Sequence, residues 1–61
     1  MILDVDELMR YYRSLSCSEL QDEYRLTVKE YIACDDPHRK IELKLHLTAL
    51  RSVLKEKCIV P

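Results

Sequence analysis

The sequence predicts an all-α protein in which an antiparallel helical hairpin, about residues 17–34 and 37–57, follows a short helix over about residues 4–14. Three observations support this fold class: the 61 residues include no glycine, apolar residues recur at spacings of three and four, and one Asp-Pro pair interrupts the pattern. A chain this short forms one domain, residues 1–61, and buries only about 60% of its unfolded surface. We therefore expect the hairpin to complete its core as a homodimeric helical bundle.

The first helix is predicted from an apolar stripe that follows acidic residues. The stripe consists of Val5, Leu8, Tyr12 and Leu15. Acidic side chains in the first turn stabilise a helix because they lie at the positive end of its dipole. Ser16 and Glu19 then match the capping-box pattern S-x-x-E, in which each side chain bonds the backbone N–H of the other residue. The sequence thus predicts that one helix ends and a second begins here.

The second and third helices are predicted to meet at Asp36-Pro37. Proline disfavours helical conformation in the residue before it but suits the first position of a helix, and Asp36 can cap the free N–H groups. Residues 41–47 also alternate apolar and polar as a half-buried strand would, but no second alternating run is present to pair with them. Their Leu, Lys and Glu content favours a helix, which we predict throughout 37–57.

If the two long helices pack antiparallel about Pro37, the numbers of facing residues should have a constant sum. The apolar stripes meet this condition, because four pairs each sum to 74: Leu20 with Leu54, Tyr24 with Leu50, Thr27 with Leu47, and Tyr31 with Leu43. Agreement between two independent stripes indicates a short-looped helical hairpin.

A set of charged pairs has the same sum but cannot form within the hairpin. These pairs are Glu19 with Lys55, Glu23 with Arg51, and Glu30 with Lys44. At roughly 100° per residue, the glutamates precede their apolar stripe and the basic residues follow theirs, so antiparallel packing places the two groups on opposite sides. The residues that lie across from the glutamates are Arg39, His46, Val53 and Lys57. We therefore expect the pairs Glu19–Lys57 and Glu30–His46.

The side away from the glutamates carries a basic stripe that only Asp35 opposes. Its members are Lys40, Lys44, Arg51 and Lys55 of the third helix, and Arg25, Val28 and Ile32 of the second helix lie beside it. One interpretation is that the acidic first helix lies on this side and covers Val28 and Ile32. The other is that the stripe binds an acidic partner, either a protein or a nucleic acid. Tyr11 lies outside the apolar stripe of the first helix and is a further candidate for a partner contact.

Two apolar residues of the third helix, Ile41 and Leu45, fall nearly opposite its apolar stripe. A hairpin of two helices cannot bury both sides of one helix, so such residues usually contact a further helix or another protomer. We therefore predict that Ile41 and Leu45 mediate self-association.

Composition and cysteine usage indicate a cytoplasmic protein. The net charge of −1 gives no global attraction to nucleic acid or membrane, and no apolar run approaches the ~20 residues that span a bilayer. Acidic residues directly after Leu3 do not fit the start of a signal peptide. The three cysteines, Cys17, Cys34 and Cys58, form an odd set without CxxC, which is a poor fit to a disulfide framework and suggests a reducing compartment.

Residues that could carry chemistry are few. Cys34, His38 and His46 could form a metal site or a thiolate–imidazole pair, but their spacing matches no known zinc motif. A hairpin of this size also has little room for a substrate cleft. We predict no catalytic residues, no metal, no cofactor and no enzymatic activity.

One segment carries a family resemblance. Leu15-Ser16-Cys17-Ser18-Glu19-Leu20, together with Tyr24, resembles the opening of the Sda-like inhibitors of sporulation histidine kinases, which are small helical hairpins. The resemblance covers only residues 15–24, and this chain departs from that family by its first helix and its Asp-Asp-Pro turn. It implies a protein that docks a hairpin on a larger enzyme and inhibits it.

The residues together predict a small non-enzymatic protein–protein interaction module, a regulator or inhibitor of the kind that phages and mobile elements encode. Two alternatives have different consequences. The chain could bind nucleic acid through the basic stripe of the third helix, which makes affinity fall steeply with salt. It could also be a structural subunit of a helical assembly, which folds poorly alone.

Overall fold

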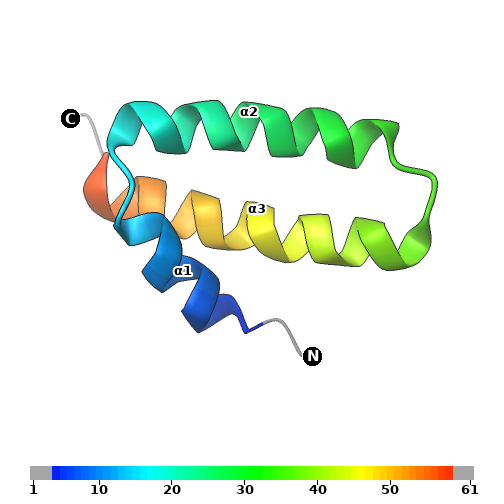
Figure 1. The fold of residues 1–61 in the computed structure, drawn as a ribbon, viewed down its shortest axis with the longest axis horizontal. Helices are drawn as coiled ribbons and strands as arrows, with labels where there is room; N and C mark the ends of the chain where they lie inside the picture. The colour runs from blue at the N-terminus through cyan, green and yellow to red at the C-terminus, as the bar shows by residue number, and fades with distance from the viewer. Residues whose placement is uncertain (1–3, 59–61) are drawn as a thin grey trace.

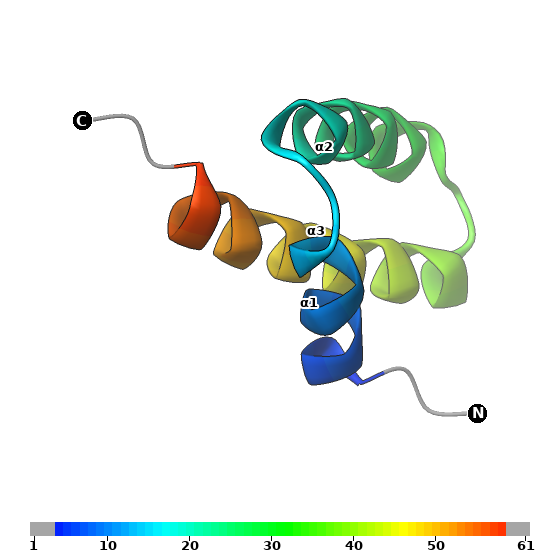
Figure 2. The ribbon, with the colours of Figure 1, turned by 60° about the vertical axis from the view of Figure 1, so that its left-hand side comes forward.

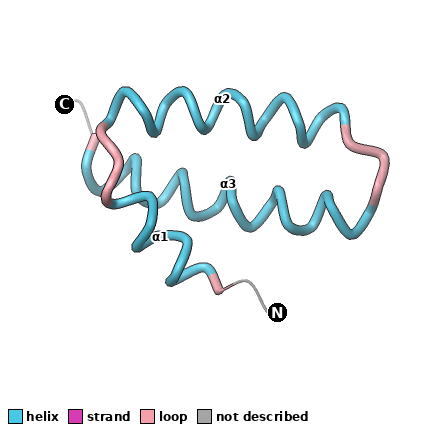
Figure 3. Tube along the Cα trace, in the orientation of Figure 1, coloured by secondary structure: helices cyan, strands magenta, loops and turns pink. Residues whose placement is uncertain are grey.

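The computed structural model describes residues 4–58, which fold into three α-helices without a strand. Helix α1 spans Val5–Arg13, α2 spans Cys17–Ala33 and α3 spans Pro37–Lys57. The predicted all-helical class is therefore confirmed. Figure 1 shows α2 and α3 lying side by side and running in opposite directions, and Figure 3 shows the short loops between the helices. None of the three helices is both long and apolar enough to cross a membrane.

Capping interactions fix the starts of the first two helices. The Asp4 carboxylate accepts a hydrogen bond from the Asp6 N–H at 3.0 Å and so caps α1. At the start of α2, the Ser16 N–H donates to Glu19 Oε1 at 3.0 Å, and the Glu19 N–H donates to Ser16 Oγ at 3.2 Å. This is the predicted capping box, and the predicted break between the two helices is confirmed.

The Asp-Pro pair starts α3 as predicted. Asp36 Oδ1 accepts a hydrogen bond from the His38 N–H at 3.0 Å, and Pro37 is the first residue of the helix. The helix continues through the alternating segment 41–47, so the helical prediction for that segment is confirmed. Proline is tolerated here because the first N–H groups of a helix have no intrahelical acceptor.

The core lies where all three helices meet, near the start of α2 and the end of α3. Its buried side chains come from each helix: Tyr12, Leu20, Ala49, Leu50 and Val53. Val5, Leu8 and Met9 of α1 pack against this cluster. Leu20 and Leu50 belong to the predicted apolar stripes, whereas Ala49 and Val53 lie on the adjacent side of α3, where α1 packs.

Helix α1 covers the side of α3 that faces away from the basic stripe. Tyr12 Oη is hydrogen-bonded to His46 Nδ1 at 2.7 Å, and Figure 2 shows α1 lying against α3. Ile32 remains 75% exposed. The interpretation that α1 covers Val28 and Ile32 is therefore wrong. The physical reason is that the small, fully buried Ala49 allows a close approach of α1 on the opposite side of α3.

Candidate interaction surface

Helix α3 has two opposite sides with different surroundings. On one side, His46 is hydrogen-bonded to Tyr12 of α1, and Ala49 and Val53 pack in the same core cluster as Tyr12. At roughly 100° per residue, Lys44 and Arg51 point about 180° away from the mean direction of those three residues. Both basic side chains are exposed. The structure therefore leaves the predicted basic stripe uncovered.

We call this uncovered side the basic flank. It consists of Arg25, Lys40, Lys44, Arg51 and Lys55, together with Val28, Ile32 and Ile41. All five basic residues are exposed, and within residues 4–58 none of them forms an ion pair. Ile32 is 75% and Ile41 is 62% exposed. The flank thus combines positive charge with exposed apolar side chains.

A hollow of about 300 Å³ lies on the basic flank beside the α2–α3 loop, and it is lined by Tyr31, Pro37, Lys40, Ile41 and Lys44. Lys40 Nζ lies 5.3 Å from the centroid of the Tyr31 ring, a cation–π contact. Apart from the two lysines, the lining residues are apolar or aromatic. The hollow therefore suits an apolar side chain that is flanked by carboxylates.

A second hollow of about 200 Å³ lies along α3 and is lined by Thr48, Arg51, Ser52 and Lys55. Clefts that hold small molecules usually measure ~300–1,000 Å³. Both hollows lie at or below the lower end of that range. The flank is consequently better suited to a macromolecular surface than to a small-molecule substrate.

The opposite side carries the glutamates, as helix handedness predicts, but their partners differ from those predicted. Glu30 pairs with Arg39 at 3.5 Å, and His46 bonds Tyr12 in place of Glu30. Lys57 bonds backbone oxygens in place of Glu19. The predicted pair Glu30–His46 is therefore wrong. Glu19 and Lys57 form no direct ion pair, but they lie on the same side, because the hydrogen bonds with Ser16 and, to a smaller extent, the charge of Lys57 lower the pKa of Glu19. The prediction that Arg39 lies across from the glutamates is confirmed.

Two of the predicted contact residues lie away from the basic flank. Tyr11 of α1 is 60% exposed and lines a hollow on the acidic side, together with Leu15, Glu19, Asp22 and Glu23. Leu45 is partly buried and directly precedes His46, which bonds α1. Of the two predicted self-association residues, only Ile41 belongs to the exposed flank.

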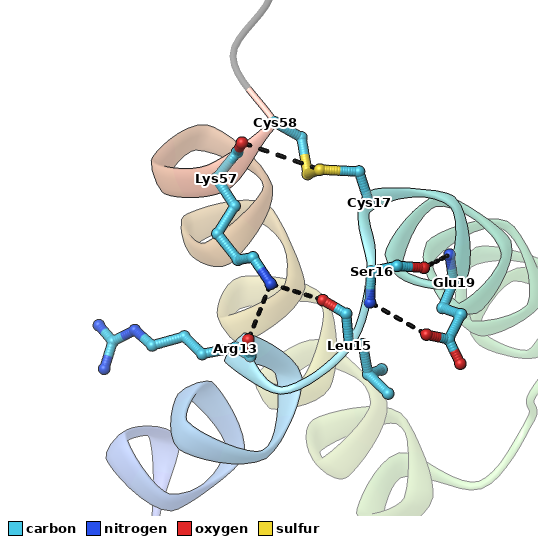
Figure 4. The surroundings of a disulfide bond; sticks show 7 residues. All are labelled: Arg13, Leu15, Ser16, Cys17, Glu19, Lys57 and Cys58. Carbon is cyan, nitrogen blue, oxygen red and sulfur yellow. Dashed lines mark hydrogen bonds between the residues drawn. A yellow bond between two sulfur atoms is a disulfide. The ribbon is translucent and has the colours of Figure 1, made fainter.

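A disulfide joins the start of α2 to the end of α3 (Figure 4). It links Cys17 with Cys58, whose Cα atoms are 5.8 Å apart, while Cys34 is free. The expectation of reduced cysteines, drawn from the odd count, is wrong for this pair. The residue numbers 17 and 58 sum to 75, which differs by one from the sum of 74 shared by the apolar pairs. The same antiparallel register could therefore have predicted the bond. Disulfides persist mainly outside reducing compartments, which weighs against the predicted cytoplasmic location.

Polar contacts surround the disulfide and hold the same end of the molecule (Figure 4). Lys57 Nζ donates to the carbonyl oxygens of Arg13 at 2.8 Å and of Leu15 at 2.6 Å. The Arg13 carbonyl belongs to the last turn of α1 and the Leu15 carbonyl lies just beyond it, where backbone acceptors lack intrahelical donors. Arg13 also donates to both carboxylate oxygens of Glu56 at 3.0 Å, which lowers the pKa of Glu56. We call residues 13–19 and 56–58 the clasped end.

The Tyr12 hydroxyl is a buried polar group between α1 and the middle of α3. The residue is only 3% exposed, and its hydroxyl is satisfied by the hydrogen bond to His46. Burial raises the pKa of Tyr12 to about 12, and the negative charge of Glu23 contributes in the same direction. The phenol is therefore neutral near pH 7, and its hydrogen bond links α1 to α3.

The residues considered for chemistry do not come together. Within the described part of the chain, no three His, Cys, Asp or Glu side chains gather closely enough to hold a metal ion. His46 is bonded to Tyr12, and Cys34 Sγ lies 3.5 Å from the Asp36 carbonyl oxygen in the loop. The basic flank is therefore the feature that best supports a function.

Comparison with known proteins does not identify the chain: no protein family, curated protein or solved structure matches it. The resemblance of residues 15–24 to Sda-like inhibitors thus rests on those residues alone.

Proposed function

We propose that this chain is a small non-enzymatic protein–protein interaction module, a regulator or inhibitor that docks its α2–α3 hairpin on a larger protein through the basic flank. One observation carries the proposal. Helix α1 covers the opposite side of α3 and leaves Lys44 and Arg51 exposed, without an ion pair in residues 4–58. Charged rims around apolar contacts steer and align protein partners.

The chemistry of the flank favours an acidic protein surface as the partner. Ile32 and Ile41 are exposed between the basic residues, and the hollow beside Ile41 can accept an apolar side chain. A nucleic acid would bind the charges but gain little from the isoleucines. The acids on the opposite side and the net charge of −1 would also repel its phosphates.

Affinity capture from the native host tests the proposal, with wild type compared with Lys44→Glu/Arg51→Glu. The matched control is Arg10→Glu/Lys29→Glu, which makes the same charge change at two exposed residues outside the flank. We expect mass spectrometry to find a protein that wild type and control retain and that the flank variant loses. Capture of the same proteins by all three chains would contradict the proposal.

Two other outcomes of this capture would replace the protein partner. Recovery of DNA or RNA, with retention that falls steeply as salt rises, would identify a nucleic-acid-binding protein. Recovery of a stable helical complex, combined with a dilute chain that shows little helix by circular dichroism, would identify a structural subunit.

The proposal includes self-association as a homodimeric or larger helical bundle. Its support is the 62% exposure of Ile41 and the small size of the core.

A further inference from the structure

Two exposed stripes of opposite charge run along α2 and α3 on opposite sides of the molecule. The acidic stripe of α2 consists of Glu19, Glu23, Leu26, Glu30 and Ala33. The basic stripe of α3, limited here to the single row on which Lys44 and Arg51 lie, consists of Ile41, Lys44, Thr48, Arg51 and Lys55. Each follows alternating spacings of three and four, so its members lie in one row along the helix. All ten residues are exposed.

The two stripes match position for position when they are aligned antiparallel. Five pairs sum to 74: Glu19 with Lys55, Glu23 with Arg51, Leu26 with Thr48, Glu30 with Lys44, and Ala33 with Ile41. Three of these pairs join opposite charges, and none joins like charges. The other two place Leu26, which is 56% exposed, beside the Thr48 methyl group, and Ala33 beside Ile41. Antiparallel helices that pack through such rows have this register.

Within one chain these pairs cannot form, because α2 and α3 contact each other through their apolar stripes and direct the charged stripes to opposite sides. The contacts Arg39–Glu30 and Lys40–Tyr31 mark the two sides. Glu30 already pairs with Arg39, and the Glu19 carboxylate accepts the Ser16 N–H. Glu23 and Arg51 form no ion pair within residues 4–58, and a second copy of the chain supplies a partner to each, since its stripes have the matching register.

We propose that the chain self-associates head to tail, with the basic stripe of one copy docked antiparallel on the acidic stripe of the next. This inference rests on the self-association included in the proposed function and specifies its surfaces. Tyr11 lies beside Glu19 and Glu23, so the docked α3 covers this exposed tyrosine as well.

The arrangement differs from a two-fold dimer. Each copy uses one stripe per contact and keeps the other stripe free on its opposite side. Contacts between different surfaces of identical chains produce rings or open rows. Because exposed ion pairs are individually weak and are screened by salt, the association is expected to weaken as ionic strength rises.

A charge exchange between register partners tests the proposal. The parent is Cys34→Ser, which prevents disulfides between copies, and its mass is measured by light scattering and sedimentation over a concentration series at low salt. Glu23→Lys and Arg51→Glu each place like charges opposite each other, so each variant alone should self-associate about tenfold more weakly than the parent. An equimolar mixture restores opposite charges at every contact, and we expect it to regain the mass of the parent.

Lys29→Glu is the matched control, because it makes the same charge change as Arg51→Glu at an exposed residue outside both stripes. On its own it should keep the mass of the parent. Loss of association by Lys29→Glu equal to that of Arg51→Glu, or unchanged association of a folded Arg51→Glu, would overturn the head-to-tail contact while self-association remains. A parent that stays monomeric at every concentration would overturn both, and docking on an acidic protein would still be decided by the capture experiment.

Discussion

The two ends of the α2–α3 pair differ in how their side chains are used. At the clasped end, Cys17 is bonded to Cys58, Arg13 is paired with Glu56, and Lys57 bonds two backbone oxygens. At the other end, residues 31–41, which we call the turn end, Arg39 pairs with Glu30 and Glu42, but Ile32 and Ile41 are exposed. Within residues 4–58 the Lys40 ammonium forms no ion pair and contacts the Tyr31 ring.

This difference indicates that stability and binding are assigned to different parts of a very small molecule. A domain of this length has few internal contacts and a correspondingly small margin of stability. The disulfide and the Lys57 hydrogen bonds stabilise the clasped end, so the apolar and basic side chains of the flank can remain exposed. Variants that remove the bonds of the clasped end should therefore change folding, and variants along the exposed flank should change association.

The largest effect is expected from removal of the disulfide. Cys17→Ser/Cys58→Ser opens a loop closed over a sequence separation of 41, for which chain entropy predicts a loss of about 4 kcal/mol in the free energy of unfolding. This loss is a large part of the stability of a 61-residue domain, which has about 3–9 kcal/mol in total. Urea unfolding followed by circular dichroism measures the change.

Cys34→Ser is the control for this variant, because Cys34 is a free cysteine in the loop at the turn end. It should leave the unfolding midpoint within experimental error of wild type. If Cys17→Ser/Cys58→Ser unfolds at the same urea concentration as wild type, the disulfide does not stabilise the fold. The clasped end would then not be the more stable end.

The sequence predicted the features that depend on local chemistry. The capping box of Ser16 and Glu19 and the Asp36-Pro37 start of α3 need only neighbouring residues, so the helix starts are recognisable in the sequence. Helix handedness alone placed Arg39 on the side of Glu30, because the angle between residues on a helix is fixed.

The features that the sequence did not predict depend on a choice between tertiary alternatives. Helix α1 could have packed on either side of α3, and charge favoured the basic side. The observed side is set by shape, since Ala49 and Val53 are fully buried beside α1. The odd cysteine count argues against a disulfide, whereas the register of the apolar stripes brings Cys17 and Cys58 together, and the structure follows the register.

A smaller effect is expected from Lys57→Met, which keeps most of the aliphatic chain but removes the ammonium group that bonds Arg13 and Leu15. Loss of charged hydrogen bonds at an exposed position should lower the free energy of unfolding by about 1–2 kcal/mol. The matched variant Lys55→Met makes the same change on the basic flank and should cost less than ~0.5 kcal/mol. Thermal unfolding measures both changes. Equal losses in the two variants would show that the hydrogen bonds of Lys57 add no stability beyond that of an exposed lysine such as Lys55.

The smallest of these effects concerns Tyr12, whose bond to His46 joins α1 to the middle of α3, between the two ends. Tyr12→Phe removes this bond and should lower the free energy of unfolding by about 1 kcal/mol near neutral pH. The same residue also predicts an alkaline pH dependence. Its pKa is raised from 10.0 to about 12 in the folded chain, so the folded state holds the phenolic proton more tightly than the unfolded state.

The full contribution of Tyr12 is therefore present below pH 10. Between pH 10 and about 12 the unfolded chain loses this proton first, and the free energy of unfolding should fall as the pH rises. Lysines and other tyrosines titrate in the same range, so the quantity to measure is the difference between wild type and Tyr12→Phe, in a Cys34→Ser background that prevents thiol exchange with the disulfide. Tyr31→Phe is the control, because it removes a phenol at the turn end that does not contribute to the raised pKa of Tyr12, and it should keep the wild-type profile. If the free energy of unfolding of Tyr12→Phe falls with rising pH as that of wild type does, the Tyr12–His46 hydrogen bond does not stabilise the packing of α1 on α3.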